Sequence, residues 1–125
     1  MLAGLPLTLE LEPAPGQKVL VCHAAPNDPW ARTCAPDHPP EFLQRVYGSN
    51  DAAVVVYGHL HQHHTLLLGT RLLINVSSVG LRQDGLSAFT ILSFNGTWQV
   101  RQFQVPYNVE EERRLMQERG VPVPD

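Results

Sequence analysis

Three of the six histidines follow apolar segments in a way that could bring their imidazole rings to one ligand. His23 follows the apolar segment 18–22, and His59 and His61 follow the apolar segment 52–57. Residues just past the carboxyl ends of buried strands are where sheet proteins bind ligands and metals. Imidazole is the commonest neutral metal ligand, and three converging rings would suit Zn²⁺, Mn²⁺, Fe or Ni²⁺. One interpretation of the pattern is therefore a metal site.

The residues around His59 and His61 favour that interpretation without excluding a structural one. A two-residue spacing puts both rings on the same side of an extended chain. Gly58 lets the backbone turn sharply and come close to a bound group. A single histidine after a strand, such as His23, is more often a hydrogen-bonded core or surface residue, and that alternative stays open. The histidines without an expected role are His38 in a proline-rich loop and His63 and His64 on an expected solvent-exposed turn.

The elements that must position these histidines are mostly strands. Four leucines near the start alternate with other residues, which predicts an extended segment with the leucines on one face. Pro6 within it favours an edge position. Segments 18–22 and 52–57 are rich in β-branched residues and suit buried strands. The four leucines are Leu5, Leu7, Leu9 and Leu11.

Two short turn sequences predict β-hairpins. Gly69-Thr70 separates two apolar runs and indicates a tight turn. Asn95-Gly96 lies between the expected strands 88–94 and 98–105. We expect a type I′ turn there, which requires positive φ at both central residues.

Two short helices complete the expected fold. Residues 41–47 can form a helix after the proline-rich segment 27–40, which fits a functional surface loop. Residues 109–119 predict a second helix with Asn108 as its N-cap. Strands joined by hairpins and one helical crossover predict an α+β fold with a mixed or antiparallel sheet.

Length and composition limit the class of protein. A chain of 125 residues and 13.9 kDa predicts a single domain over residues 1–125. With 9 basic and 12 acidic residues the formal net charge is -3, which argues against a basic nucleic-acid-binding surface. No apolar stretch approaches the ~20 residues of a membrane span. Cys22 and Cys34 lack CxxC spacing and fit reduced thiols, so we expect a cytoplasmic protein.

The motifs around these histidines resemble those of the calcineurin-like metallophosphoesterases, in particular the bacterial small phosphodiesterase branch. Gly58-His59-Leu60-His61, followed by a hairpin and Asn75-Val76-Ser77-Ser78-Val79-Gly80, resembles the family's Gly-His-Thr-His and Asn-Pro-Gly-Ser-Val-Gly. His23-Ala24-Ala25-Pro26 resembles its earlier His-Gly-Ser-Pro, and the tail from Arg82-Gln83-Asp84-Gly85 onward is also similar. The resemblance spans nearly the whole chain, in the correct order.

The resemblance implies a β-sandwich flanked by helices, with divalent metal ions at one end. His23 and His59 resemble ligands of the second metal of a two-metal centre, and His61 resembles a ligand of the first. Gly58 and Asn75 resemble positions that shape the site, and we assign no catalytic residue. The implied activity is hydrolysis of phosphodiesters or phosphomonoesters by a metal-activated water.

The chain departs from the family by lacking its earlier motifs. It contains no Asp-X-His, Gly-Asp or Gly-Asn-His, so the bridging carboxylate and the general-acid histidine have no counterpart. Ala24 replaces a glycine, and Val76-Ser77 replaces Pro-Gly. The resemblance therefore implies the carboxyl-terminal half of a metallophosphoesterase-type β-sandwich, with two short helices. Three neutral imidazoles could hold one ion or none, but not a bridged pair of cations without carboxylates.

Half of a sandwich leaves an apolar sheet face uncovered, which predicts association. We expect a homo-oligomer, such as a two-fold dimer, or a missing amino-terminal half. One candidate function is therefore part of a metal-dependent phosphoesterase acting on a phosphate-ester substrate. The alternative is a catalytically inactive metal- or phosphate-binding remnant that acts as an oligomeric interaction domain. A third interpretation is an interaction module whose histidines are incidental.

Overall fold

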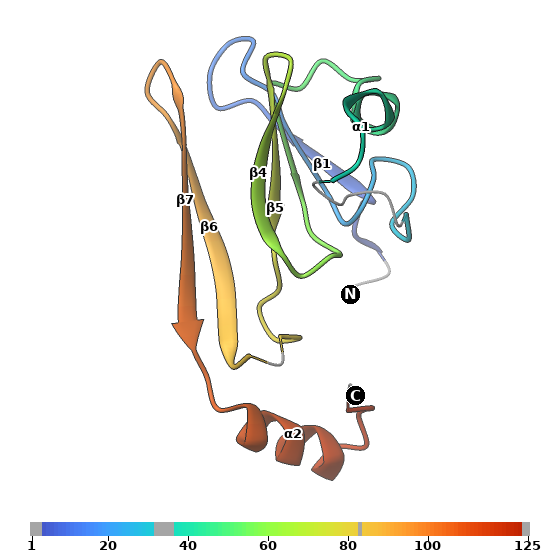
Figure 1. The fold of residues 1–125 in the computed structure, drawn as a ribbon, viewed down its shortest axis with the longest axis vertical. Coiled ribbons are helices and arrows are strands. Elements are labelled where there is room, and N and C mark those ends of the chain that lie inside the picture. The colour runs from blue at the N-terminus through green and yellow to red at the C-terminus, as the bar shows by residue number, and fades with distance from the viewer. Residues whose placement is uncertain (1–3, 32–36, 83, 124–125) are drawn as a thin grey trace.

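The computed structural model describes residues 4–31, 37–82 and 84–123, so Cys34 lies outside the described residues. A five-stranded sheet lies beside a two-stranded sheet, and one helix extends past their ends (Figure 1). The strands are β1 (Thr8–Leu11), β2 (Val19–Cys22), β3 (Val54–Tyr57), β4 (His63–Leu68), β5 (Arg71–Val76), β6 (Leu86–Phe94) and β7 (Trp98–Pro106). The helices are α1 (Pro40–Tyr47) and α2 (Val109–Glu118).

The five-stranded sheet has a parallel centre and two antiparallel edges. Its strand order is β1-β2-β3-β5-β4. Strands β2, β3 and β5 run parallel, whereas β1 is antiparallel to β2 and β4 is antiparallel to β5. The α+β fold with a mixed sheet is thus confirmed. The expected edge strand is present as β1, but it includes only Leu9 and Leu11, because Leu5 and Leu7 precede it. Because the central strands are parallel, their carboxyl ends reach the same edge of the sheet.

Helix α1 covers one face of this sheet. Its residues Leu43 and Tyr47 are buried against Val55 and Leu73 of the central strands. The Tyr47 hydroxyl donates a hydrogen bond to the carbonyl of Ala24 at 2.7 Å. The helix therefore fixes the chain segment that immediately follows His23.

The β6–β7 hairpin covers part of the opposite face. Trp98 packs against a buried cluster of Val19, Val54 and Ile74, together with other inward-facing residues of the hairpin. Its indole Nε1 donates to the side-chain oxygen of Gln17 at 2.9 Å. The central strands are thus apolar on both faces because another element packs on each, as parallel strands require.

The hairpin leaves part of that second face open. Leu9 and Leu11 of β1 pair in register with Val21 and Val19 of β2, so these four side chains share the face. Leu9 is 49% exposed and Leu11 is 50% exposed. The outward face of the hairpin is also apolar and exposed, at Phe89, Ile91, Phe103 and Val105. We call the Leu9–Leu11 region the open inner face.

The turn between β6 and β7 differs from the expected type I′ turn. Phe94 pairs with Trp98, which leaves residues 95–97 in the loop. Gly96 has a φ of 95°, whereas Asn95 is not among the residues with positive φ. A three-residue loop needs only one left-handed residue, and the glycine supplies it.

His63 and His64 begin strand β4, so the expectation of a solvent-exposed turn was wrong for them. Both are half-buried, and His64 Nε2 lies 2.6 Å from the hydroxyl of Tyr57. The physical reason is a tighter reversal than the sequence indicated. The backbone is left-handed at both His59 and His61, so the chain has already turned back when it reaches residue 63.

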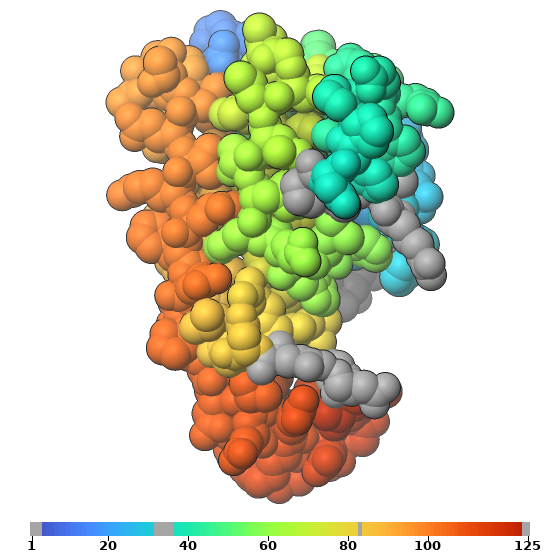
Figure 2. All heavy atoms as spheres, in the orientation of Figure 1, coloured from blue at the N-terminus to red at the C-terminus, as the bar shows by residue number. Residues whose placement is uncertain are grey.

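Helix α2 forms the far end of the molecule, beyond both sheets (Figures 1 and 2). As predicted, it is capped by Asn108, whose side chain accepts a hydrogen bond from the Glu111 amide at 3.1 Å. It ends at Glu118, one residue before the expected end, and none of its residues is buried. No helix within the described residues is long and apolar enough to cross a membrane.

Candidate metal centre

The carboxyl ends of β2 and β3 bring the segments that carry His23 and His59 together. Val21 of β2 pairs in parallel with Val56 of β3, so the two chains leave the sheet side by side. The Gly58 amide then donates to the His23 carbonyl at 2.9 Å, which extends the pairing past the strands. Two segments far apart in the sequence thus meet at one edge of the sheet.

The imidazoles of His23 and His59 are in direct contact. His23 Nε2 lies 3.2 Å from His59 Nδ1, and the ring planes are 84° apart. Two nitrogens bound to one tetrahedral Zn²⁺ at its usual bond length lie about 3.4 Å apart. The pair therefore fits two adjacent positions on one metal ion. Without a metal, the same separation permits a hydrogen bond between the rings.

His61 lines the same hollow as His23 and His59. In the described ranges, however, no group of three or more histidine, cysteine, aspartate or glutamate side chains is arranged to hold a metal ion. The structure thus brings two of the three predicted ligands into contact and places the third on the wall they share. Within these ranges, the donors in contact with each other are the imidazoles of His23 and His59.

The backbone at the two histidines that follow β3 is unusual. His59 has a φ of 70° and His61 a φ of 54°, the left-handed region that residues with a Cβ seldom adopt. Gly58, where we expected the sharp turn, is not among the residues with positive φ. A Cβ at Gly58 would meet the His23 carbonyl oxygen at 3.7 Å, an ordinary contact. Such conformations cluster at functional sites, where the surroundings hold them in place.

Asn75, at the end of β5, links the loops around the centre. It is fully buried. Its side-chain amide donates to the Gly58 carbonyl at 2.6 Å, and its side-chain oxygen accepts from the Ser77 amide at 2.9 Å. Both loops are therefore tied to the same side chain.

Ser77 connects this loop to His61. Its hydroxyl donates to the His61 carbonyl at 2.9 Å and accepts from Arg82 Nη1 at 3.1 Å. Ser77 is itself left-handed, with a φ of 68°, and its relative exposure is only 6%. Neither Ser77 nor Arg82 had an expected role. Ser77 lies in the motif at residues 75–80 and Arg82 in the Arg82-Gln83-Asp84-Gly85 segment, and both segments resemble the family.

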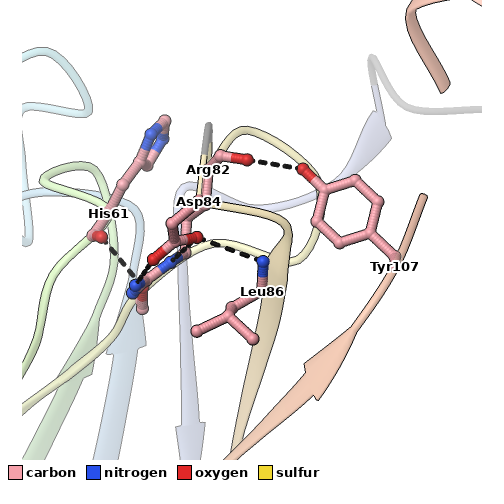
Figure 3. Close-up of polar contacts among 6 residues, drawn as sticks. His61, Arg82, Asp84, Leu86 and Tyr107 are labelled. Atoms are coloured by element: carbon pink, nitrogen blue, oxygen red, sulfur yellow. Dashed lines mark hydrogen bonds and ion pairs between the residues drawn. The ribbon is translucent and has the colours of Figure 1, made fainter. Parts of the chain in front are cut away.

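Arg82 and Asp84 form an ion pair beside residues 58–62, the loop that carries His59 and His61 (Figure 3). We call residues 58–62 the histidine loop. Arg82 Nε donates to Asp84 Oδ1 at 3.0 Å, and Asp84 also accepts from the Leu86 amide at 3.1 Å. Their mutual hydrogen bond raises the pKa of Arg82 and lowers the pKa of Asp84. The Tyr107 hydroxyl donates to the Arg82 carbonyl at 2.6 Å. The pair thus joins the histidine loop to the start of β6 and the end of β7.

The environment of His63 disfavours its protonated form. Burial lowers the pKa of its imidazole most, and the positive charge of Arg82 lowers that pKa further. A hydrogen bond with the Val76 backbone opposes the shift. His63 therefore adds no positive charge beside Arg82 when its imidazole is in the favoured neutral form.

Comparison with solved structures identifies the fold of the chain. No protein-family model and no curated protein matches the chain. It is similar to a hypothetical protein from Pyrococcus horikoshii OT3, with a TM-score of 0.79 at 14% identity over 97% of this chain and 48% of that one. A metallophosphoesterase from Sphaerobacter thermophilus gives a TM-score of 0.70 at 19% identity over 97% of this chain and 56% of that one.

A third similar structure was solved with a metal. Wild-type Vps29 from Entamoeba histolytica, complexed with Zn²⁺, gives a TM-score of 0.56 at 20% identity over 84% of this chain and 63% of that one. The chain therefore has the metallophosphoesterase-type fold that its motifs implied. It spans about half the length of the first two structures it matches.

Proposed function

We propose that this chain carries the histidine part of a metal-dependent phosphoesterase site. The observation that supports this most directly is the 3.2 Å separation of His23 Nε2 and His59 Nδ1 at the carboxyl ends of parallel strands. The fold around the pair is shared with a protein described as a metallophosphoesterase. His61, on the wall of the same hollow, is the third proposed ligand.

A divalent ion bound there would polarise a phosphoryl oxygen and lower the pKa of a bound water. The residues of this chain would hold and orient it. His23 and His59 offer nitrogen lone pairs only when neutral, so binding would weaken at acid pH. Val21, Val56 and Val76 line the same hollow and give it an apolar wall. Imidazole ligands leave Mn, Zn, Fe and Ni as candidates.

We further propose that carboxylate ligands come from polypeptide outside the described residues. Neutral imidazoles do not offset the charge of a metal ion, and acidic side chains do so in two-metal phosphoesterase sites. The open inner face lies on the same side of the sheet as Val21, which lines the hollow. A polypeptide covering this face would also reach the metal centre. The remaining half of a longer protein is the proposed covering, and a second copy of the chain is the other candidate.

The alternative function is a metal- or phosphate-binding domain without turnover. The observation that favours it is that the described side chains supply no carboxylate to the His23–His59 pair. Under this proposal the chain binds a metal but does not hydrolyse a phosphate ester, alone or with added polypeptide. Either protein would function in the cytoplasm, where reduced thiols persist.

Metal titration and hydrolysis separate these functions. The chain, freed of any histidine tag, is titrated with Zn²⁺ and with Mn²⁺ by calorimetry, and hydrolysis of a generic aryl phosphodiester is assayed. The assay is repeated with the protein encoded by the longer reading frame or its neighbouring gene. We expect His59→Ala and His23→Ala to lose metal binding, whereas the control His38→Ala retains it, since His38 packs against Phe42 away from the pair.

Each result has a definite meaning. Turnover that appears only with the added polypeptide and vanishes in His59→Ala supports the phosphoesterase. Metal binding without turnover in every combination supports the inactive domain. Equal metal affinity in the wild type, His59→Ala and His38→Ala would contradict both.

A further inference from the structure

The two loops of the candidate centre meet through a pair of left-handed residues. Ser77 and His61 both have positive φ, and the Ser77 hydroxyl donates to the His61 carbonyl. Residues with a Cβ keep this conformation only when neighbouring contacts determine it. The His61 backbone therefore depends on what orients the Ser77 hydroxyl.

The hydroxyl is oriented by Arg82. A serine hydroxyl has one proton to donate. Since that proton is directed to the His61 carbonyl at 2.9 Å, an oxygen lone pair faces the Nη1 of Arg82 at 3.1 Å. The series of hydrogen bonds thus runs from Arg82 as donor to Ser77, and from Ser77 to the His61 carbonyl. A charged donor strengthens the hydrogen bond that the hydroxyl makes in turn.

The geometry also argues against a role for Arg82 as a direct substrate ligand. The guanidinium donates to both oxygens of Asp84 as well as to Ser77. Only 18% of its side chain is exposed. Figure 3 shows the His61 imidazole pointing away from the Arg82–Asp84 pair. The guanidinium therefore acts on the carbonyl side of His61, behind the ring.

We infer that Arg82 is a positioning residue for His61, acting through Ser77. This inference rests on the proposed function in so far as His61 is a metal ligand. Arginine stays charged throughout the physiological pH range, so the support it gives does not change within that range. Asp84 holds the guanidinium in place and also accepts a hydrogen bond from the amide of Leu86, the first residue of β6. The orientation of His61 is thereby coupled to the docking of the two-stranded sheet.

The test uses Arg82→Ala, Ser77→Ala and Arg82→Lys in the full chain. The control is Arg101→Ala, which removes an arginine that lies over the Phe103 ring on β7. We measure Zn²⁺ affinity by calorimetry, and the backbone coupling constant and carbon shifts of His61 by NMR without metal. The double variant Arg82→Ala/Ser77→Ala is measured in the same way.

We expect Arg82→Ala and Ser77→Ala each to weaken Zn²⁺ binding roughly 10-fold, the effect usual for residues that orient ligands. The double variant should lose no more than either single variant, because the two residues act in series. The His61 shifts should leave left-handed values in both, while Arg82→Lys restores part of the affinity by donating to Ser77.

Unchanged His61 shifts in Arg82→Ala, or a Zn²⁺ affinity equal to that of Arg101→Ala with only a lower melting temperature, would overturn the inference. A wild-type chain that binds no Zn²⁺ would contradict the proposed function instead. In that case the NMR arm still decides whether Arg82 fixes the His61 backbone.

Discussion

Asn75 is the buried polar side chain on which the geometry of the candidate metal centre depends. It is one of two polar residues that are buried among those described, and the other, Ser77, is its neighbour in the network. Its amide group satisfies the Gly58 carbonyl and the Ser77 amide at once. A buried group left without its partner costs far more than an intact hydrogen bond contributes.

We therefore expect Asn75→Ala to lower the free energy of unfolding by about 2–4 kcal/mol, because two backbone groups lose their partner. The same substitution should shift the ring signals of His59, since Gly58 precedes it. Urea unfolding and histidine ring NMR measure the two effects.

The control is Asn50→Ala. Asn50 also makes two side-chain hydrogen bonds to backbone, with Tyr47 and Ala52, but it is only half-buried. Water can replace these bonds, so we expect a loss of about 1 kcal/mol and unchanged His59 signals. Equal behaviour of the two variants would show that Asn75 has no special relation to the centre.

At the scale of elements, the β6–β7 hairpin covers one side of the core with its inward-facing side chains. Its two faces differ: Trp98 packs inward on the central strands, while Phe103 lies on the outward face. The hairpin is also attached at its base, where Asp84 accepts from the Leu86 amide. Leu92 and Val100 pack inward beside Trp98, and Gln102 Nε2 donates to the Asn75 carbonyl at 3.1 Å. Trp98 is the largest side chain in this contact.

Trp98→Ala should destabilise the chain by about 3 kcal/mol, because the substitution removes a large apolar group from the contact between the two sheets. Phe103→Ala, on the outward face at 37% exposed, should cost less than about 1 kcal/mol. Thermal unfolding measures both. A larger loss for Phe103→Ala would mean that its outward face is buried in solution.

Asp84 should make stability depend on acid pH. Its pKa is lower in the folded chain than in the unfolded chain because of the hydrogen bond with Arg82. The stabilisation is therefore complete above about pH 4, the unfolded pKa, and is lost as the pH falls through the folded pKa. As the pH is lowered into this acid range, the melting temperature of Asp84→Asn should therefore fall less than that of the wild type.

Asp51→Asn provides the comparison for that experiment. Asp51 pairs with Lys18 at 2.6 Å, and its pKa is lowered in the same direction. We expect both substitutions to reduce the acid dependence, but only Asp84→Asn to change the His61 signals. An unaltered acid dependence in Asp84→Asn would contradict the assigned ion pair.

At the scale of the whole molecule, the described chain leaves apolar surface where a folded domain normally buries it. Leu9 and Leu11 share a face with buried Val19, and the outward side of the hairpin is apolar as well. Large exposed apolar patches mark interaction surfaces. Two solved structures of this fold are about twice as long as the part that this chain matches.

We expect the isolated chain to self-associate, and Leu9→Ser/Leu11→Ser to reduce that association with little loss of stability, because both leucines are about half exposed. Leu67→Ser is the control, since Leu67 is 70% exposed on the opposite edge strand β4. Light scattering after gel filtration gives the molar mass. A well-folded wild-type monomer at all concentrations would contradict this prediction.

The local features of the fold could be predicted because they depend on neighbouring residues. The Asn108 cap of α2 is present as expected, and two of the four alternating leucines, Leu9 and Leu11, lie in β1. Residue 63 was misplaced because its strand depends on how tightly the preceding chain reverses. Asn95 was assigned a left-handed conformation that the three-residue loop, closed by Phe94 and Trp98, does not require.

The sequence by itself identified three candidate ligands, His23, His59 and His61, which follow two apolar segments. Only the tertiary structure decided which of them meet. Parallel pairing of β2 with β3 brings His23 and His59, 36 residues apart, within 3.2 Å, because parallel strands end at the same edge of a sheet. The Arg82–Ser77–His61 network was likewise absent from any pattern, since hydrogen bonds between loops depend on backbone angles that residue types do not specify.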